Sequence, residues 1–417
     1  MLTIYVLRID GCSGFEKMAG KVDRLNIIFM AHGHYPHGMA ATRRLQNSID
    51  YLKGCDGVEV RVLVLRQGRA RLADSEPCGV HKGVEYVTIG GGIRSGISAI
   101  VKGPKYFIDG MAHIRNNRRK DCKNALYVFG YPSTDNMPML IVARLLGYKM
   151  VFDIVEDIAY LKSATDVFAR LRYFSQRAFF GTLRMFADAV LVVSKHLEQR
   201  VARIAKGRFD VINYPISVDF DNFSSSAQPF HDPVRFFYGG TFADKDGVEN
   251  LIAAFEDLCG RHDNVNLVLT GKGGKEDMDA ILGIIAASAH REKILYKGYL
   301  PDEDFYRELN ASDVLCMTRT ASAFADTGFP FKLGEYLATG RPVIASDVSD
   351  VSRYLTDGEN ALLIEPDSPG AITCAMERLL ADRGKAQDIG IAGRAVAKEH
   401  FDSRVLGERL RKLLIDL

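Results

Sequence analysis

Lys332 and Glu335 have the chemistry and the spacing of a ligand-binding pair on one short helix. Pro330 suits the first turn of this helix, and Gly340 suits the left-handed residue that ends it. The free backbone N–H groups at the start of a helix attract anions, and a lysine beside them suits a diphosphate. A carboxylate one turn further along can accept both hydrogen bonds of a vicinal diol such as a ribose. The pattern predicts a pocket for a nucleotide sugar.

The alternative is that Lys332 and Glu335 form an exposed ion pair worth roughly 0.3 kcal/mol. Because the lysine lies nearer the N-terminus, this pair would oppose the helix dipole and would stabilise the helix poorly. Gly328 precedes the helix and lets the backbone approach a ligand closely. The residues therefore favour the ligand-binding interpretation.

The composition is that of a globular protein of two or three domains. The 417 residues are 47% hydrophobic and 25% charged with a net charge of +2, so nucleic acid is not an expected partner. The cysteines are scattered without CxxC spacing, which indicates reduced thiols, a cytoplasmic location and no zinc site. No apolar run approaches the ~20 residues of a membrane span, and residues 1–22 lack the apolar core of a signal peptide.

Short apolar runs alternate with helical patterns, which predicts parallel sheets joined by right-handed crossovers. The expected strands are 26–31, 58–65, 126–129, 150–155, 189–193, 235–238, 265–270, 294–296, 314–317, 343–345 and 361–364. A last helical region is expected over 368–417. Residues 213–233 are rich in serine and proline and are expected to link two domains. Two Rossmann-like domains would then face a central cleft, with ligands at the carboxyl ends of the strands.

The loop 33–38 follows the first strand and precedes a helix, so Gly38 is expected to lie in a ligand loop. No Lys-Ser/Thr pair follows it, so it is not a P-loop. The histidines of this segment make a weak metal site because no carboxylate is close in the sequence. Arg43 and Arg44, just inside the helix, could reach a phosphate or lie on the surface.

Two glycine loops in the second half also follow strands. Gly240, Thr241 and Lys245 lie in the first loop, where glycine lets the backbone approach phosphates and the two other side chains add donors. This loop lacks the full GxGxxG pattern, so a dinucleotide site is not expected. Gly271 and Lys272 lie in the second loop, which could line a nucleotide base or simply turn the chain.

Two acidic pairs need interpretation. Glu156 and Asp157 end a strand and are either catalytic candidates or N-caps of the next helix. Asp219 and Asp221 have the DxD spacing of metal-dependent transferases. Their position in the linker indicates that this match is incidental, and no metal site is expected.

Residues 168–186 interleave arginines with aromatic residues and contain no acid. The arginines are Arg170, Arg172, Arg177 and Arg184. Such a helix could lie on an anionic membrane surface, or it could pack into the core with a solvated basic edge.

The chain resembles glycosyltransferase family 4, the retaining transferases with the GT-B fold, over about residues 26–410. The resemblance is strongest in 329–335 and 340–347 and continues through 355–363. Supporting matches are 193–194, 211–213, Gly240-Thr241, Gly247 and 269–271, together with the glycine loop before Arg43.

The resemblance implies a role for each matching residue. Glu335 matches the second acid of the family's Glu-x7-Glu motif and would bind the nucleotide ribose, while Lys332 would hold the diphosphate. Gly328, Phe329 and Pro330 match the backbone segment that lies along the donor sugar and diphosphate.

The chain departs from the family pattern at two places. Thr327 stands where the first acid is expected, which leaves the identity of the sugar open. Thr241 and Lys245 occupy the region of the family's usual arginine. Gly38 matches the N-terminal loop that closes over the donor.

The implied fold is α/β of the GT-B type. Residues 1–215 would form an acceptor-binding domain, 216–400 a nucleotide-sugar-binding domain, and 401–417 a helix that crosses back to the first domain. Glu156 or Asp157 falls where relatives carry a histidine or aspartate near the sugar.

The implied reaction is retaining transfer of a hexosyl or N-acetylhexosaminyl group from a nucleoside diphosphate sugar to a glycan or lipid-linked acceptor. Lys332 and backbone N–H groups would stabilise the departing diphosphate, which takes the acceptor's proton in the front-face scheme. No carboxylate nucleophile, metal or other cofactor is then required.

By analogy the enzyme would act in bacterial surface polysaccharide biosynthesis. It would be cytoplasmic and would touch the inner face of the membrane through 168–186. The alternatives are an inactive sugar-nucleotide-binding or scaffold protein and a GT-B sugar-nucleotide epimerase.

Overall fold

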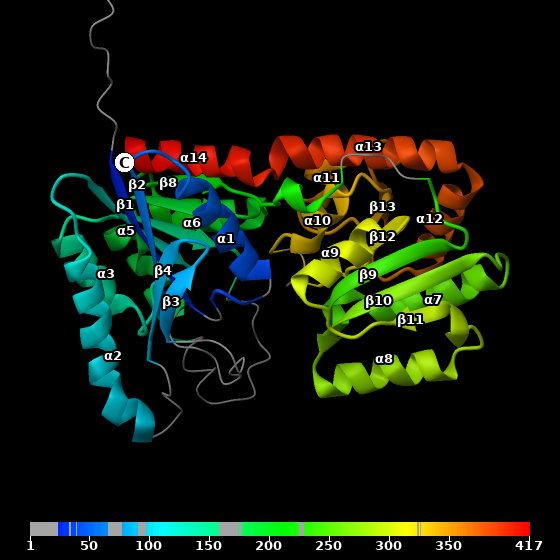
Figure 1. The fold of residues 1–417 in the computed structure, drawn as a ribbon, viewed down its shortest axis with the longest axis horizontal. Helices are drawn as coiled ribbons and strands as arrows, with labels where there is room; N and C mark the ends of the chain where they lie inside the picture. Colours follow the sequence, from blue (N-terminus) through cyan, green and yellow to red (C-terminus); the bar gives the residue numbers. More distant parts are fainter. Residues whose placement is uncertain are drawn as a thin grey trace, which may run out of the picture.

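The computed structural model describes residues 24–32, 35–38, 40–65, 77–90, 97–157, 174, 177–224, 229–322, 325 and 327–417. These residues form two α/β lobes that lie side by side (Figure 1). The last two helices run along one edge of the molecule, the first against one lobe and the second against the other.

In the described part of the chain, the first lobe is built on an eight-stranded sheet of order β3-β4-β2-β1-β5-β6-β7-β8, parallel except for β3. The strands are β1 Leu25–His32, β2 Val58–Leu65, β3 Cys78–His81, β4 Val84–Ile89, β5 Lys123–Phe129, β6 Lys149–Ile154, β7 Ala189–Val192 and β8 Asp210–Asn213. The helices are α1 Ala40–Leu52, α2 Ile97–Asn116, α3 Met137–Leu145, α5 Leu183–Phe186 and α6 Lys195–Ala205, with 3-10 turns at Phe180–Thr182 and Phe220–Asn222. The strand order reverses direction between β1 and β5, which is where doubly wound sheets bind ligands.

The second lobe has a six-stranded, fully parallel sheet of order β11-β10-β9-β12-β13-β14 within the described ranges. Its strands are β9 Val234–Phe242, β10 Val265–Gly273, β11 Ile294–Tyr296, β12 Val314–Met317, β13 Val343–Ser346 and β14 Leu362–Ile364. Its helices are α7 Val248–Cys259, α8 Lys275–Ala287, α9 Asp302–Asn310, α10 Phe331–Ala338, α11 Val351–Tyr354, α12 Pro369–Ala381 and α13 Arg383–His400, with 3-10 turns at Asp244–Asp246 and Arg291–Lys293. Here the order reverses between β9 and β12.

The final helix, α14 Ser403–Asp416, packs on α1 of the first lobe. A Cβ added at Gly407 would lie 2.3 Å from the Tyr51 ring, so the two helices approach too closely for a larger residue. Tyr51 Oη also donates a hydrogen bond of 2.8 Å to Glu408. The chain therefore passes between the lobes twice, once before β9 and once before α14.

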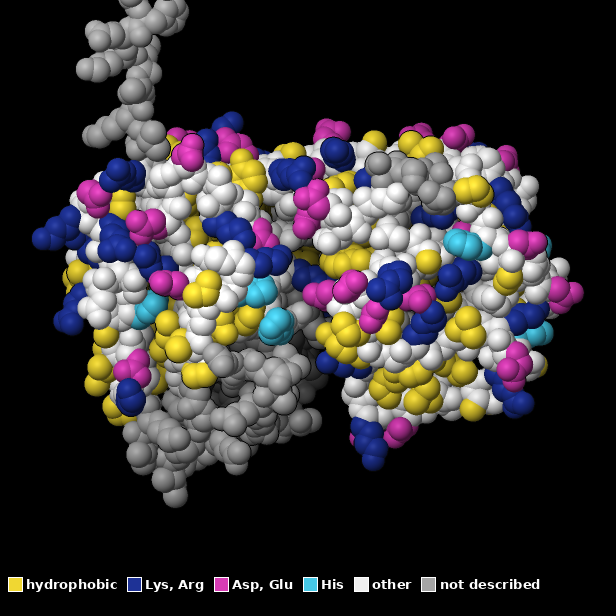
Figure 2. Space-filling view, in the orientation of Figure 1, with side chains coloured by type: hydrophobic (Ala, Val, Ile, Leu, Met, Phe, Trp, Pro, Cys, Tyr) yellow, Lys and Arg dark blue, Asp and Glu magenta, His cyan; other side chains and the backbone are white. Residues whose placement is uncertain are grey.

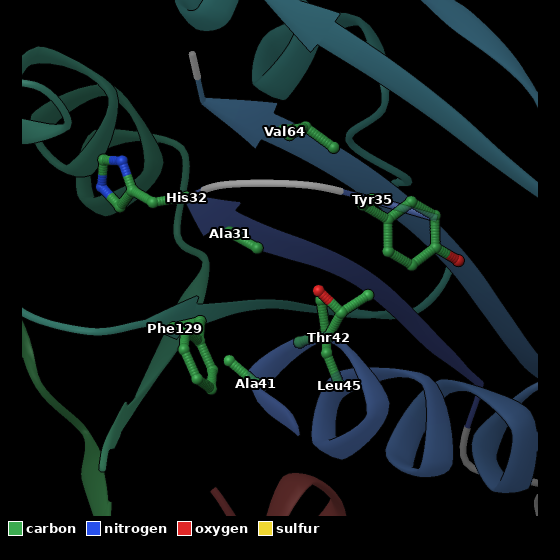
Figure 3. Close-up of a pocket in the computed structure, with 8 residues that line it drawn as sticks. All are labelled: Ala31, His32, Tyr35, Ala41, Thr42, Leu45, Val64 and Phe129. Atoms are coloured by element: carbon green, nitrogen blue, oxygen red, sulfur yellow. The ribbon is translucent and has the colours of Figure 1, made fainter. Parts of the chain in front are cut away.

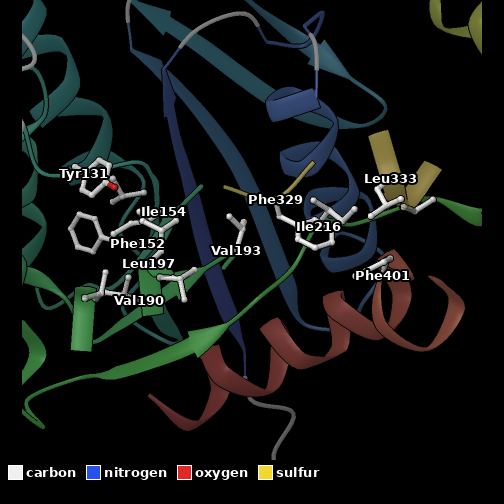
Figure 4. Close-up of a cluster of buried hydrophobic side chains, with 14 of the residues drawn as sticks. Tyr131, Phe152, Ile154, Val190, Val193, Leu197, Ile216, Phe329, Leu333 and Phe401 are labelled. Carbon is white, nitrogen blue, oxygen red and sulfur yellow. The ribbon is translucent and has the colours of Figure 1, made fainter. Parts of the chain in front are cut away.

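One apolar cluster extends through both lobes and through the crossing point between them (Figure 4). Ile216 of the linker, Leu333 of α10 and Phe401 before α14 meet there. The two crossing segments are also hydrogen-bonded, because Val218 N donates to Phe401 O at 2.8 Å and Ser403 N donates to Val218 O at 2.9 Å. The lobes are thus joined by a packed and bonded hinge.

The expected architecture of two parallel-sheet lobes is confirmed. The helical region expected over 368–417 is divided into α12, α13 and α14. The antiparallel hairpin of β3 and β4 was not expected, because its outer strand is largely exposed and lacks a buried apolar face. Among the described residues, no helix combines the length and the apolar character needed to span a membrane.

Candidate functional site

Helix α10 carries Lys332 and Glu335 between the two sheets. It begins at Phe331, directly after Pro330, and the left-handed Gly340 with φ +75° follows its end. Tyr336 joins the helix to β9, because its hydroxyl accepts from Gly239 N at 2.8 Å and donates to Gly239 O at 3.1 Å. The helix is therefore fixed against the strand whose loop faces the site.

Lys332 is largely buried and points toward the loop after β9. Its ammonium group donates to Tyr238 Oη at 2.6 Å and to Asp246 Oδ1 at 3.0 Å. A Cβ added at Gly240 would lie 2.9 Å from Nζ, so this glycine leaves room for the ammonium group. Burial lowers the pKa of Lys332, although the attraction of Asp246 opposes this.

Asp246 is only 2% exposed and also accepts from Thr241 Oγ1 at 2.6 Å. Burial alone would raise the pKa of Asp246, but the charge of Lys332 and the hydrogen bond from Thr241 outweigh this effect. The pKa of Asp246 is therefore lowered overall. The result is an ionised carboxylate that holds Lys332 in position. Thr241 therefore acts on Lys332 through Asp246. The sequence alone did not single out Asp246.

Arg319 follows β12, the neighbour of β9 in the sheet. Its Nη1 atom is buried and has no hydrogen-bond partner among the described residues. Burial lowers the pKa of this guanidinium, while the charges of Asp246, Tyr238 and Glu156 act in the opposite direction. A second, partly buried cation thus lies near Lys332 at the point where the strand order reverses.

Glu335 faces the other lobe. Its Oε1 accepts from Arg43 Nη1 of α1 at 3.1 Å and from Tyr306 Oη of α9 at 3.1 Å. Arg43 also pairs with Asp302 at 2.5 Å and stacks at 5.2 Å from the Phe305 ring. Burial and the nearby Glu335 raise the pKa of Tyr306, so its hydroxyl stays protonated and donates to the carboxylate.

The segment before α10 is held by both lobes. Ser194 Oγ of the first lobe donates to the carbonyl of Thr327 at 2.6 Å, and Ser349 Oγ donates to the carbonyl of Gly328. The Thr327 residue is 2% exposed. Phe329 is also 2% exposed and packs 5.7 Å from the Phe401 ring, so only its backbone is available to a ligand (Figure 4).

Glu156 and Asp157, just after β6, have different environments. Asp157 is 1% exposed and accepts from Arg200 Nη1 at 2.6 Å and from His196 Nε2 at 3.1 Å, both on α6. Glu156 is exposed, and its charge acts on Arg319 of the opposite lobe. Asp157 therefore ties the end of β6 to α6, whereas Glu156 keeps an exposed carboxylate whose charge reaches Arg319.

The remaining predicted donor residues lie around this centre. A Cβ added to Gly271, which has φ +140°, would lie 1.8 Å from the carbonyl of Gly240, because the glycine ends of β9 and β10 were expected as loops but pair as strands. Lys245 is partly buried, whereas Lys272 is exposed and its ammonium group lies 4.2 Å from the centre of the Tyr299 ring. Gly38 lies in the described segment 35–38, shortly before α1.

Several other candidates have structural partners. Arg44 is fully buried and pairs with Asp153 at 2.8 Å, so it is not a surface or phosphate-binding arginine. Asp219 caps the backbone N–H of Asp221, and Asp221 pairs with Arg404 at 2.7 Å. Among the described residues no cluster of three or more histidine, cysteine or acidic side chains could hold a metal ion.

Part of the stretch 168–186 lies outside the described residues, including Arg170 and Arg172. Of the described side chains, Phe180 and Phe186 are buried in the apolar core. Phe174 and Met185 are 59% and 65% exposed. The described part therefore has both a packed side and an exposed apolar side.

A pocket in the first lobe lies where the strand order reverses there (Figure 3). It is formed by the ends of β1, β2 and β5 and the first turns of α1. Its lining is mostly apolar, with His32 and Thr42 as polar exceptions. The surface is also indented between the two lobes (Figure 2).

Comparison with known proteins finds similarity to glycosyl transferases. Residues 219–396 match the family described as Glycosyl transferases group 1. The phosphatidyl-myo-inositol mannosyltransferase of Mycobacterium leprae is 26% identical over 241 residues, which cover 56% of this chain and 62% of that protein.

Two solved structures cover almost the whole chain. Sucrose-phosphate synthase of Thermosynechococcus elongatus has a TM-score of 0.70 at 17% identity and covers 94% of this chain and 98% of its own. Anabaena HepE in complex with UDP has a TM-score of 0.68 at 15% identity and covers 94% and 100%. The fold is therefore GT-B, as expected, and the second lobe is similar to group 1 glycosyl transferases. The narrower assignment to family 4 stays a prediction.

Proposed function

We propose that this chain is a retaining glycosyltransferase that moves a sugar from a nucleoside diphosphate sugar to a glycan or lipid-linked acceptor. The observation that carries the proposal is the arrangement of α10. Its Lys332 lies at the reversal point of the second sheet, and its Glu335 lies beside Arg43 of the first lobe. One helix thus presents a cation for a diphosphate and a carboxylate for a diol.

In this proposal the second lobe binds the donor. Lys332 holds the diphosphate, helped by the partly buried Lys245 and by the backbone N–H groups of Gly328 and Phe329 before α10. Glu335 accepts from the ribose hydroxyls. Gly271 and Lys272 lie beside the nucleotide base.

The first lobe binds the acceptor and covers the sugar. Glu156 contacts the donor sugar, while Asp157 holds the end of β6 against α6. Gly38 and Arg43 approach the donor from α1 and its preceding loop, and the pocket beside His32 receives part of the acceptor. The apolar lining of that pocket supports a partly apolar or sugar-ring surface as its occupant.

The chemical step consists of placement and charge stabilisation. As the bond from the anomeric carbon to the diphosphate breaks, Lys332 stabilises the negative charge on the leaving oxygen. In the front-face scheme this oxygen takes the proton of the acceptor hydroxyl, which attacks the same face of the sugar. The protein then supplies no nucleophile, and the scheme calls for no metal ion.

We also propose a role at the cytoplasmic face of a bacterial membrane, in surface polysaccharide biosynthesis. The Mycobacterium leprae relative is described as acting on phosphatidyl-myo-inositol, which supports a lipid-linked acceptor. The exposed Phe174 and Met185 support peripheral membrane contact in the region of 168–186.

A thermal-shift screen with UDP-, GDP-, ADP- and CMP-sugars tests donor binding, because a ligand of the native state raises the melting temperature. We expect one base and sugar to stabilise the wild type selectively. Lys332→Met should lose this shift, whereas Lys275→Met, at the exposed start of α8, should keep it. No shift with any nucleotide sugar would overturn the proposal.

The stereochemistry can be tested with water as the acceptor. Slow hydrolysis of the selected donor is followed by proton NMR, and the first anomer released should keep the configuration of the donor. Release of the opposite anomer would overturn the retaining mechanism. Conversion to a different nucleotide sugar without release would favour the epimerase, and binding without any turnover would favour the inactive binding protein.

A further inference from the structure

Arg319 is a partly buried cation with a fully buried Nη1 atom, and the site described above gives it no role. It lies two residues after the end of β12, and the strand order of the sheet reverses between β9 and β12. The loops after β9 and β12 meet there: Thr320 N donates to Lys245 O at 3.1 Å, and Thr318 Oγ1 donates to Asp246 O at 3.3 Å. A side chain after β12 therefore reaches the same region as one after β9.

The Arg319 guanidinium is incompletely satisfied. Its Nη1 atom is buried, and no acceptor among the described residues forms a hydrogen bond with it. Leaving a buried donor unpaired is costly, and the cost is larger for a charged group. Such an atom at the ligand-binding edge of a sheet indicates a position that an anionic ligand fills.

The charges around Arg319 also suit an anion. Asp246 lies nearby in the same lobe and is already paired with Lys332 at 3.0 Å. Glu156 acts on Arg319 from the other lobe. The cations Lys332 and Arg319 balance the carboxylates Asp246 and Glu156, and the partly buried Lys245, which also acts on Lys332, gives the site a surplus positive charge.

We propose that Arg319 donates to the diphosphate of the bound donor, as the second cation beside Lys332. This inference rests on the proposed function. The end of β9 carries Thr241 in the region where the family's usual arginine was expected, and Thr241 donates to Asp246. Arg319 supplies the missing guanidinium from the neighbouring strand, and its fork of N–H groups matches phosphate oxygens better than a lysine does.

The test is isothermal titration of the wild type and two variants with UDP, GDP and ADP and with the matching nucleosides. Arg319→Gln should weaken binding of the selected diphosphate by about 10- to 100-fold, because it loses charge-assisted hydrogen bonds. Binding of the nucleoside should change less than about 3-fold. Arg319→Lys keeps the charge but loses the fork, so it should show a smaller loss, again restricted to the diphosphate.

Arg291→Gln is the matched control, because Arg291 is exposed and forms an ion pair with its neighbour Glu292. It should bind like the wild type. Melting temperatures without ligand show whether each variant is folded, and Arg319→Lys carries the test if Arg319→Gln does not fold.

Three results would overturn the inference. Unchanged diphosphate binding by both Arg319 variants would remove Arg319 from the site. Equal losses for the diphosphate and the nucleoside would indicate a structural role. Failure of the wild type to bind any diphosphate would overturn the proposed function as well. Binding by the wild type with no effect of the Arg319 variants would overturn only the inference about Arg319.

Discussion

Glu335→Gln tests whether this carboxylate recognises the ribose of the donor. The substitution keeps the size of the side chain but removes its charge and one of its two acceptor oxygens. A hydrogen bond to a charged group contributes about 1.5–3 kcal/mol, so two ribose hydroxyls would contribute about 3–6 kcal/mol. The Glu335 side chain is 16% exposed, so water screens it only in part.

The lower end of that range is the better expectation. Oε1 already accepts from Arg43 and Tyr306, and the donor must share the carboxylate with them or displace them. A loss of about 3 kcal/mol corresponds to roughly 100-fold weaker binding. We therefore expect Glu335→Gln to bind the selected nucleoside diphosphate about 100-fold less tightly than the wild type.

The assay compares ribo-, 2′-deoxy- and 3′-deoxynucleoside diphosphates by isothermal titration in a double-mutant cycle. The affinity of the wild type should fall by at least about 10-fold for each missing hydroxyl, whereas the affinity of Glu335→Gln should fall by less than about 3-fold. Arg43→Gln is the matched control, because it removes the same ion pair and leaves the carboxylate. It should discriminate ribose from deoxyribose as the wild type does.

The reasoning is refuted if Glu335→Gln still distinguishes ribo- from deoxynucleotides as strongly as the wild type does. Loss of discrimination in Arg43→Gln as well would mean that the interlobe ion pair, and not contact with the ribose, governs recognition.

Three further predictions concern the framework of the site. Asp153→Ala should lower the free energy of unfolding by about 3–5 kcal/mol, because Arg44 is left buried without its carboxylate; a loss below about 1 kcal/mol in urea denaturation would contradict this. Gly271→Ala should lower the free energy of unfolding by at least about 2 kcal/mol, because the new Cβ would lie 1.8 Å from a backbone oxygen. Gly283→Ala on α8, where the new Cβ meets open space, should leave the stability unchanged or raise it in the same assay. Hydrogen bonds from Arg411 and Tyr51 lower the pKa of Glu408 to about 2, so its contribution to stability is present above about pH 4.5 and is lost as the pH falls toward about 2. Glu408→Gln should therefore be less stable than the wild type at neutral pH by no more than about 1 kcal/mol, because the side chain is 32% exposed and its ion pairs are screened by water. The two proteins should converge in acid unfolding.

Most strands of the two sheets could be predicted from the sequence, because buried parallel strands are continuous apolar runs. The first strand was expected over 26–31 and is observed as β1 Leu25–His32. The hairpin of β3 and β4 carries no such signal in its outer strand, where Val80 is 67% exposed. The glycine ends of β9 and β10 were read as loops, but they pair with each other as strand.

The site could be predicted only where its residues are close in the sequence. Lys332 and Glu335 were recognised as a pair on one helix, but three residues correspond to about 300° of rotation. The two side chains therefore diverge by about 60° and meet different partners. Asp246 and Arg319 come together because β9 and β12 are neighbours. That strand order is a property of the fold, and no spacing in the sequence encodes it.

The contacts between the lobes differ in chemistry at the two ends of the interface. At the hinge they are apolar and backbone-bonded, with Ile216 and Phe401 in one cluster and Val218 paired with Phe401 and Ser403. Across the site they are polar, as in the Arg43–Glu335 pair. A donor can replace polar contacts with its own hydrogen bonds, but it cannot replace a packed core. We therefore expect the lobes to open and close around the hinge while the donor exchanges, because the proposed transfer needs a site that excludes water during the chemical step.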